Sequence, residues 1–143
     1  ALLVLDVPLM DAISASSIRT IRASEDMPPQ ELANLAWAYS KLSIPDRPLR
    51  DAISAASRPK LREFRPPHLA ITLWSIATLG LENAPLINAI SSQSLRSITQ
   101  FEQQHLSNTS WAYATMALCD EPLLYALAEA AMRRIPDCDQ QNL

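Results

Sequence analysis

The sequence of 143 residues contains a single glycine, Gly80, and two cysteines, Cys119 and Cys138. Scarce glycine argues against β-hairpins and against loops that cradle phosphate groups, because both use backbone with positive φ. No Cys-x-x-Cys pair occurs, which favours a reducing compartment or inert thiols over a disulfide framework. No apolar run approaches the roughly 20 residues of a membrane span. The apolar first five residues are too short, and lack the basic flank, for a signal peptide.

Positive charge is also scarce. Lys and Arg number 12 against 15 Asp and Glu, and the formal net charge is −3, so the chain as a whole is not a basic nucleic-acid binder. Proline, by contrast, occurs 11 times, and hydrophobic residues make up 48 % of the chain. This combination predicts helices with frequent boundaries and enough apolar surface for one compact domain.

An internal repeat organises the sequence. Trp37, Trp74 and Trp111 are each separated by 37 residues. Such a period is typical of an α-solenoid of helical hairpins, so we predict an all-α fold. A Pro-Leu pair recurs near the start of each unit, and we expect the array to be part of a longer one, since both ends fall inside a unit. The predicted units are 8–47, 48–84, 85–121 and a partial 122–143.

The first helix of each unit is predicted from its N-cap and its apolar face. An Asp or Asn precedes each Pro-Leu pair by two residues, which suits an N-cap followed by proline in the first turn. Pro59 is expected to shorten or kink this helix in the second unit. The predicted N-caps are Asp6, Asp46, Asn83 and Asp120. The apolar face comprises Leu9, Ala12, Ile13 and Ile21 in the first unit and Leu86, Ala89, Ile90 and Ile98 in the third.

The second helix of each unit follows an apolar residue and, in the first two units, a pair of prolines. The three tryptophans are expected to be core residues, with a base-stacking platform as the alternative. Asn34 and Asn108 are expected to be buried amides that link adjacent helices, with ligand contact as the alternative. The apolar entry positions are Met27, Phe64, Phe101 and Cys138, and the prolines are Pro28, Pro29, Pro66 and Pro67. The buried face is expected to run through Leu32, Leu69, Leu106 and Leu143.

No pattern in the sequence indicates catalysis. His68 and His105 hold the same repeat position, which places them about 10 Å apart on neighbouring helices and too far apart to share a metal ion. Each is expected to be a polar residue in a first helical turn. No Ser-His-Asp set, carboxylate pair or Gly-rich loop stands out. We therefore predict a protein that is not an enzyme and has no metal site, cofactor or small-molecule substrate.

Basic residues gather at the end of the first helix of each unit, without an acid among them. Cations there complement the helix dipole, which is a purely structural explanation. Stacked units would also align them into a basic stripe that meets phosphates or a partner at the repeat spacing. The predicted stripe consists of Arg19, Arg22, Arg58, Lys60, Arg62, Arg96, Arg133 and Arg134.

The segments "PPQELANLAWAYSKL" and "EQQHLSNTSWAYATM" resemble octotricopeptide repeats, and more widely the helical repeats of FAST-kinase-like and RAP-domain proteins. The resemblance covers essentially the whole chain, although the second unit departs from it at Ile71 and Ile76. It implies an α-solenoid of the chloroplast or mitochondrion that binds organellar RNA for maturation, stability or translation. It also implies that polar positions on an inner helix face read the bases.

Two functions are compatible with these observations. The first is a single-stranded RNA-binding solenoid of an organelle. The second is a protein-binding scaffold, an accessory subunit docked on a large organellar assembly such as a ribosome or photosystem. The acidic balance, the small number of repeats and the apolar positions Ile87, Leu124 and Tyr125, which are expected to be exposed, favour the scaffold.

Overall fold

The computed structural model describes residues 6–24, 26–43, 46–80 and 83–139, with the backbone alone for 136–139. This part of the chain is helical without a strand, so the predicted all-α solenoid is confirmed. Its α-helices are α1 (Val7–Ala23), α2 (Pro29–Lys41), α3 (Arg47–Lys60), α4 (Pro66–Thr78), α5 (Ala84–Ser97), α6 (Gln103–Thr115) and α7 (Glu121–Asp139). Short 3-10 turns, η1 (Leu61–Glu63) and η2 (Ile98–Gln100), follow α3 and α5.

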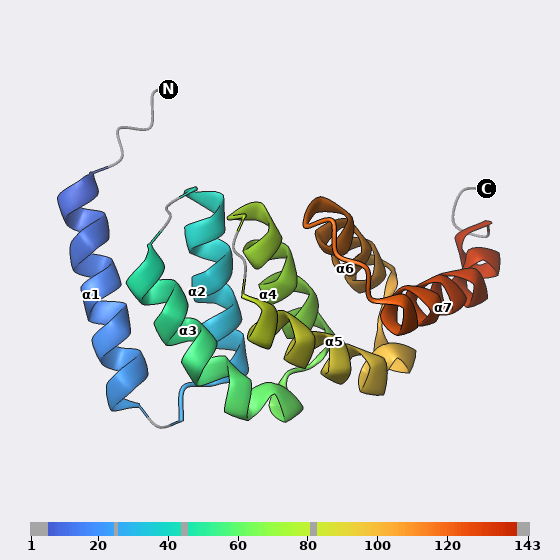
Figure 1. The fold of residues 1–143 in the computed structure, drawn as a ribbon, viewed down its shortest axis with the longest axis horizontal. Coiled ribbons are helices and arrows are strands. Elements are labelled where there is room, and N and C mark those ends of the chain that lie inside the picture. The colour runs from blue at the N-terminus through green and yellow to red at the C-terminus, as the bar shows by residue number, and fades with distance from the viewer. Residues whose placement is uncertain (1–5, 25, 44–45, 81–82, 140–143) are drawn as a thin grey trace.

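Successive hairpins stack side by side in two layers (Figure 1). Helices α1, α3, α5 and α7 form one layer, and α2, α4 and α6 form the other. Helix α4 packs closely against both α2 and α6, whereas the helices of the first layer pack less closely on each other. Helices α1 and α7 lie at opposite ends of the row. Each inner hairpin is therefore covered by a neighbour on both sides.

All four predicted N-caps are confirmed. A side-chain oxygen of the cap accepts a hydrogen bond from the backbone N–H three residues later, which satisfies a donor that the helix itself leaves free. The bonds are Leu9 to Asp6 at 3.1 Å, Leu49 to Asp46 at 2.9 Å, Leu86 to Asn83 at 3.2 Å and Leu123 to Asp120 at 3.1 Å. Each cap sets the direction in which the chain enters the first layer.

The apolar entry positions before the second-layer helices are buried, and so is the predicted leucine face of those helices. Met27, Phe64 and Phe101 belong to the hydrophobic core, as do Leu32, Leu69 and Leu106 on the following helices. The backbone of α7 continues through Cys138, and the side chain of Cys138 and all of Leu143 lie outside the described residues. The hairpins are thus held by one continuous apolar layer between the two rows of helices.

Two predictions of exposed positions in the first layer were wrong, and the predicted shortening of α3 by Pro59 is not seen. Pro59 does not shorten α3, because α3 and α5 both have 14 residues and both end in a 3-10 turn, although α5 carries Arg96 at the matching position. The chain leaves α-helical geometry there with or without proline. Ile87 is buried and Leu124 is half-buried, since the neighbouring hairpin covers them, and only Tyr125 is exposed.

A residue with left-handed backbone follows the C-cap of each second-layer helix. Ser43 (φ 53°), Gly80 (φ 61°) and Ala117 (φ 51°) stand 37 residues apart, so the repeat extends to this conformation. Glycine adopts it without the steric cost that a Cβ atom adds. A Cβ atom at Gly80 would have open space around it, so only backbone strain distinguishes the three residues.

We predict opposite effects of two substitutions at this position. Gly80→Ala should lower the free energy of unfolding by about 1 kcal/mol, and Ala117→Gly should raise it by up to about 1 kcal/mol, as measured by urea denaturation. Ala114→Gly is the matched control, because this exposed residue lies inside α6 and glycine there should cost about 1 kcal/mol. Destabilisation by both Ala→Gly changes would contradict the left-handed turn at Ala117.

Candidate functional site

The three tryptophans lie on the surface of the second layer, so the prediction that they are core residues was wrong. Trp37 is 42 % exposed and Trp111 is 46 % exposed, and Trp74 is half-buried. The buried leucine of each helix lies five residues earlier, which places the tryptophan on a different side of the helix. The tryptophan positions therefore form an aromatic row that crosses α2, α4 and α6.

Contacts between helices organise this aromatic row. The rings of Trp74 and Trp111 have centroids 5.8 Å apart and planes inclined by 31°. The Lys41 ammonium from α2 lies 5.8 Å from the Trp74 ring centroid, within the range of a cation–π interaction. Helices α4 and α6 carry no acidic or basic residue other than histidine, and α2 carries only Glu31 and Lys41. We call this surface, which is poor in charge and centred on Trp37, Trp74 and Trp111, the tryptophan face.

Asn34 and Asn108 belong to the tryptophan face, so the prediction of buried amides was wrong as well. Asn34 is exposed and Asn108 is half-buried. Each precedes a tryptophan by three residues and so points to the same side of its helix. Neither amide takes part in a side-chain hydrogen bond within the described part of the chain, which leaves both free to contact a ligand.

The two histidines cap helices, as expected of polar residues in a first turn. The Nδ1 atom of His68 accepts the backbone N–H of Arg65 at 3.2 Å, and that of His105 accepts the N–H of Glu102 at 3.0 Å. Each ring packs edge-on against the phenylalanine before its helix, with centroids 6.0 Å apart. Burial, and then the charge of Arg65, lower the pKa of His68. Burial is also the main cause that lowers the pKa of His105.

The lowered histidine pKa values predict a pH-dependent stability. As the pH falls below the ordinary histidine pKa of about 6.5, the unfolded chain takes up protons before the folded chain does, so stability present above that pH is lost. A protonated Nδ1 also cannot accept the capping hydrogen bond. Thermal unfolding should therefore shift to lower temperature between about pH 7.5 and 5.5.

The variant His68→Gln with His105→Gln is the control for this pH effect. Glutamine at the third helical position accepts the same N–H without titrating in this range. Its unfolding temperature should be nearly constant over the same pH interval. An unchanged pH dependence in the variant would assign the effect to other groups.

Three residues of the predicted basic stripe come together at one place. Arg58 in α3, Arg62 in η1 and Arg96 in α5 are exposed and line a single surface hollow. Ser92 and Gln93 of α5 line the same hollow and add uncharged hydrogen-bonding groups. We call this site the basic hollow. Guanidinium groups there can bind the oxygens of an anion from two adjacent hairpins at once.

The other members of the stripe are separate from the basic hollow. Lys60 bonds Asp26 at 3.2 Å and the Met27 carbonyl at 3.3 Å, and Arg133 bonds Glu129 at 2.5 Å, so both charges are already paired. The structure therefore shows one cluster of three arginines with scattered cations around it. Of the remaining residues, Arg19 is exposed on α1, Arg22 borders a hollow beside Asp51, and Arg134 is half-buried close enough to His105 to affect its pKa.

The described residues contain no group of three or more His, Cys, Asp or Glu side chains that could hold a metal ion. The helices in that part are also too short or too polar to cross a membrane. Cys119 is a free, exposed thiol in the turn before α7. The two surfaces described above are suited to non-covalent binding: anions at the basic hollow, and aromatic or apolar groups at the tryptophan face.

The sequence does carry a signal for the tryptophan face. Gln30, Asn34 and Lys41 stand seven and three residues before and four residues after Trp37, so all four share one side of α2. Three polar neighbours on one side indicate that the side faces water. The sequence also carries a signal for the contact between hairpins, which was missed above. Ser54 and Ser91 stand 37 residues apart, and each bonds the N-cap residue of the next hairpin.

These features define the class: a helical-repeat protein with surfaces for binding and no catalytic cluster among its described residues. The chain belongs to a family described as RNA-editing substrate-binding complex 6 protein, whose model matches residues 4–143. A search of curated proteins finds no match. The match supports an RNA-associated helical protein, while the closer resemblance to octotricopeptide repeats is not confirmed.

Proposed function

We propose that this protein is a non-catalytic module that binds single-stranded RNA through the basic hollow. The observation that carries the proposal is the convergence of Arg58, Arg62 and Arg96 from two adjacent hairpins on one hollow. No acidic residue lines that hollow, so the local charge is positive although the chain as a whole carries −3. Local charge governs contact with phosphates more than the net charge of the chain does.

The family description supports the same function, since it names a complex that binds the substrate of RNA editing. We propose that the chain contributes to holding RNA in such a complex, and that it acts in a mitochondrion. The matched family gives no support to the chloroplast alternative. The remaining members of the basic stripe, Arg19, Arg22 and Arg134, would extend the contact to neighbouring phosphates.

The RNA-binding proposal predicts a selective loss of affinity. The triple variant Arg58→Gln, Arg62→Gln and Arg96→Gln should bind a fluorescent single-stranded RNA of about 12 nucleotides at least about 10-fold more weakly at low salt. The slope of log K against log salt should fall by about 2, because three phosphate contacts to a single strand contribute about 0.7 each. Fluorescence anisotropy across a salt series measures both quantities.

A variant that removes three other cations is the matched control. Lys41→Gln, Arg47→Gln and Arg50→Gln change the net charge equally, but these residues lie at the opposite end of the hairpins. This control should retain most of the affinity and of the salt dependence. Equal losses in the two variants would show that general charge, rather than the basic hollow, carries the binding.

The tryptophan face supports a second candidate function, a protein-binding scaffold. Interfaces between proteins are depleted in charge at their centre and enriched in tryptophan, and this charge-poor surface has both properties. Among the residues of α2, α4 and α6, Lys41 is the one cation that a single-stranded RNA on the same face would meet. The face therefore suits a protein surface better than a phosphate backbone.

The scaffold candidate predicts partners that survive nuclease treatment. Trp37→Ala with Trp111→Ala should abolish their recovery in affinity purification, because exposed tryptophans contribute much of the binding energy at such interfaces. Tyr125→Ala with Met132→Ala is the control, since both side chains are exposed on α7, away from the tryptophan face. Recovery that is lost with nuclease, or that the tryptophan variant leaves unchanged, would reject this candidate.

A further inference from the structure

The outer side of α1 exposes apolar residues whose repeat counterparts are buried. Leu9 is 52 % exposed and Ile13 is 41 % exposed. Every counterpart has an apolar side chain at the same position of its helix. The difference in exposure therefore comes from whether a neighbouring hairpin covers the side chain. The counterparts are Leu49 (1 %) and Ile53 (6 %) in α3, Leu86 (2 %) and Ile90 (0 %) in α5, and Leu123 (0 %) and Leu127 (3 %) in α7.

The cover in the other units is always the preceding hairpin. Helix α3 packs against α1 and α2, α5 packs against α3 and α4, and α7 packs against α5 and α6. In each case the covering surface is therefore formed by one first-layer helix and one second-layer helix of the same repeat. The described part of the chain places no such hairpin against Leu9 and Ile13.

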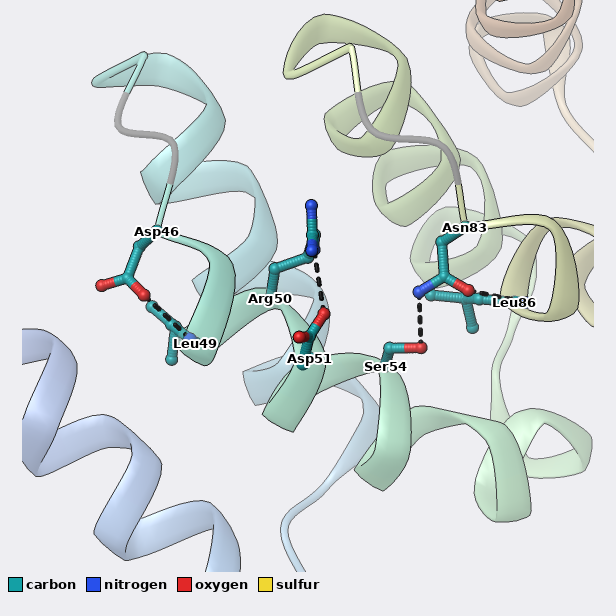
Figure 2. Close-up of polar contacts among 7 residues, drawn as sticks. All are labelled: Asp46, Leu49, Arg50, Asp51, Ser54, Asn83 and Leu86. Atoms are coloured by element: carbon teal, nitrogen blue, oxygen red, sulfur yellow. Dashed lines mark hydrogen bonds and ion pairs between the residues drawn. The ribbon is translucent and has the colours of Figure 1, made fainter.

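A polar contact accompanies this packing and marks the register of the covering hairpin. The Nδ2 group of Asn83, the N-cap of α5, donates to the Oγ atom of Ser54 in α3 at 2.8 Å (Figure 2). Ser91 of α5 donates to the carboxylate of Asp120, the N-cap residue before α7. In both cases the cap of one first-layer helix bonds a serine on the preceding one, since a hydroxyl group can donate or accept.

A buried tyrosine lies near each aspartate cap that a preceding hairpin covers, Tyr39 near Asp46 and Tyr113 near Asp120. Burial, and then the Asp46 carboxylate, raise the pKa of Tyr39, which lies beside Ser14. Burial raises the pKa of Tyr113 as well, and Asp120 raises it further. The second unit has Ile76 instead of tyrosine and Asn83 instead of aspartate. The covering hairpin thus places a tyrosine near each aspartate cap, and at Asp120 its serine also bonds the carboxylate.

Asp6 has the features of an aspartate cap without such a cover. Its backbone (φ −73°, ψ 92°) is close to that of Asp46 (φ −84°, ψ 96°), and it caps α1 through the same bond to the third residue along. Its side chain is exposed, and no serine from a first-layer helix bonds it in the described part. Leu9 and Ile13 and the carboxylate of Asp6 are therefore all exposed on the same helix.

We propose that the outer side of α1, comprising Asp6, Leu9 and Ile13, docks a two-helix hairpin of the same repeat type. The docked hairpin presents a serine to Asp6, as α3 presents Ser54 to Asn83 and α5 presents Ser91 to Asp120. A second copy of this chain is a poor occupant, because α7 has Ala128 at the serine position. This docking surface is distinct from the basic hollow and from the tryptophan face, and it does not depend on RNA binding.

A tandem protein in which residues 6–45 are repeated directly before Asp6 tests the docking surface. The added segment supplies a serine and a tyrosine in the required register. Leu9→Ala in the original position should then lower the equilibrium constant for folding about 30-fold or more, as for a buried leucine. In the chain without the added segment the same change should cost less than about 5-fold. Urea denaturation measures both.

Two further measurements complete the test. Tyr125→Ala, on the far helix α7, is the matched control and should have the same small effect in both proteins. A double-mutant cycle between Ser14→Ala in the added segment and Asp6→Ala in the original position should give a coupling of about 2-fold or more. Equal effects of Leu9→Ala in the two proteins would overturn the proposal. Self-association of the unextended chain that Leu9→Ala abolishes, seen by sedimentation velocity, would also overturn it, because the occupant would then be a second copy.

Discussion

The N-cap at the start of each first-layer helix is the interaction on which the rest of the structure depends. The aspartate or asparagine satisfies a backbone donor of its own helix, a contribution of about 1 kcal/mol for each cap. At Asn83 and Asp120 the same side chain also bonds a serine of the preceding hairpin. At these two junctions one residue therefore both starts a helix and ties it to the preceding hairpin. Asp6 and Asp46 make only the first of these contacts, so packing of the apolar layer completes the regular spacing of the solenoid.

That spacing distributes charge unevenly over the molecule. The second layer is almost uncharged, with Glu31 and Lys41 as its only acidic and basic residues within α2, α4 and α6. The first layer and its turns hold the arginines, three of which meet at the basic hollow. A chain with net negative charge can thus present a positive site and a charge-poor aromatic face. This separation makes anion binding and protein binding compatible on one small array, because each uses a different layer.

Much of the fold could be predicted from local patterns. The helical hairpins could be predicted from the 37-residue period, the four caps and the prolines. Capping and helix initiation depend on residues within one turn of each other, so they can be recognised in the sequence. The buried positions Met27, Phe64 and Phe101 followed from the same register. The candidate site was predicted less well. Lys60 and Arg133 were grouped with free arginines, yet both are paired with acids. Glu129 stands four residues before Arg133 on α7, so that pair could be predicted from the sequence, whereas Asp26 meets Lys60 only through tertiary packing.

The sequence by itself determined the class of fold, the period and the direction of each helix, because these arise from contacts between residues close together in the chain. Tertiary structure alone decided which apolar residues are covered. Leu9 and Leu49 hold the same repeat position, but Leu9 is half-exposed and Leu49 is buried. The difference depends on whether another hairpin lies against that side of the helix. The tryptophans show the same principle. Their size and recurrence favoured the core, and the packing of α2, α4 and α6 placed them at the surface.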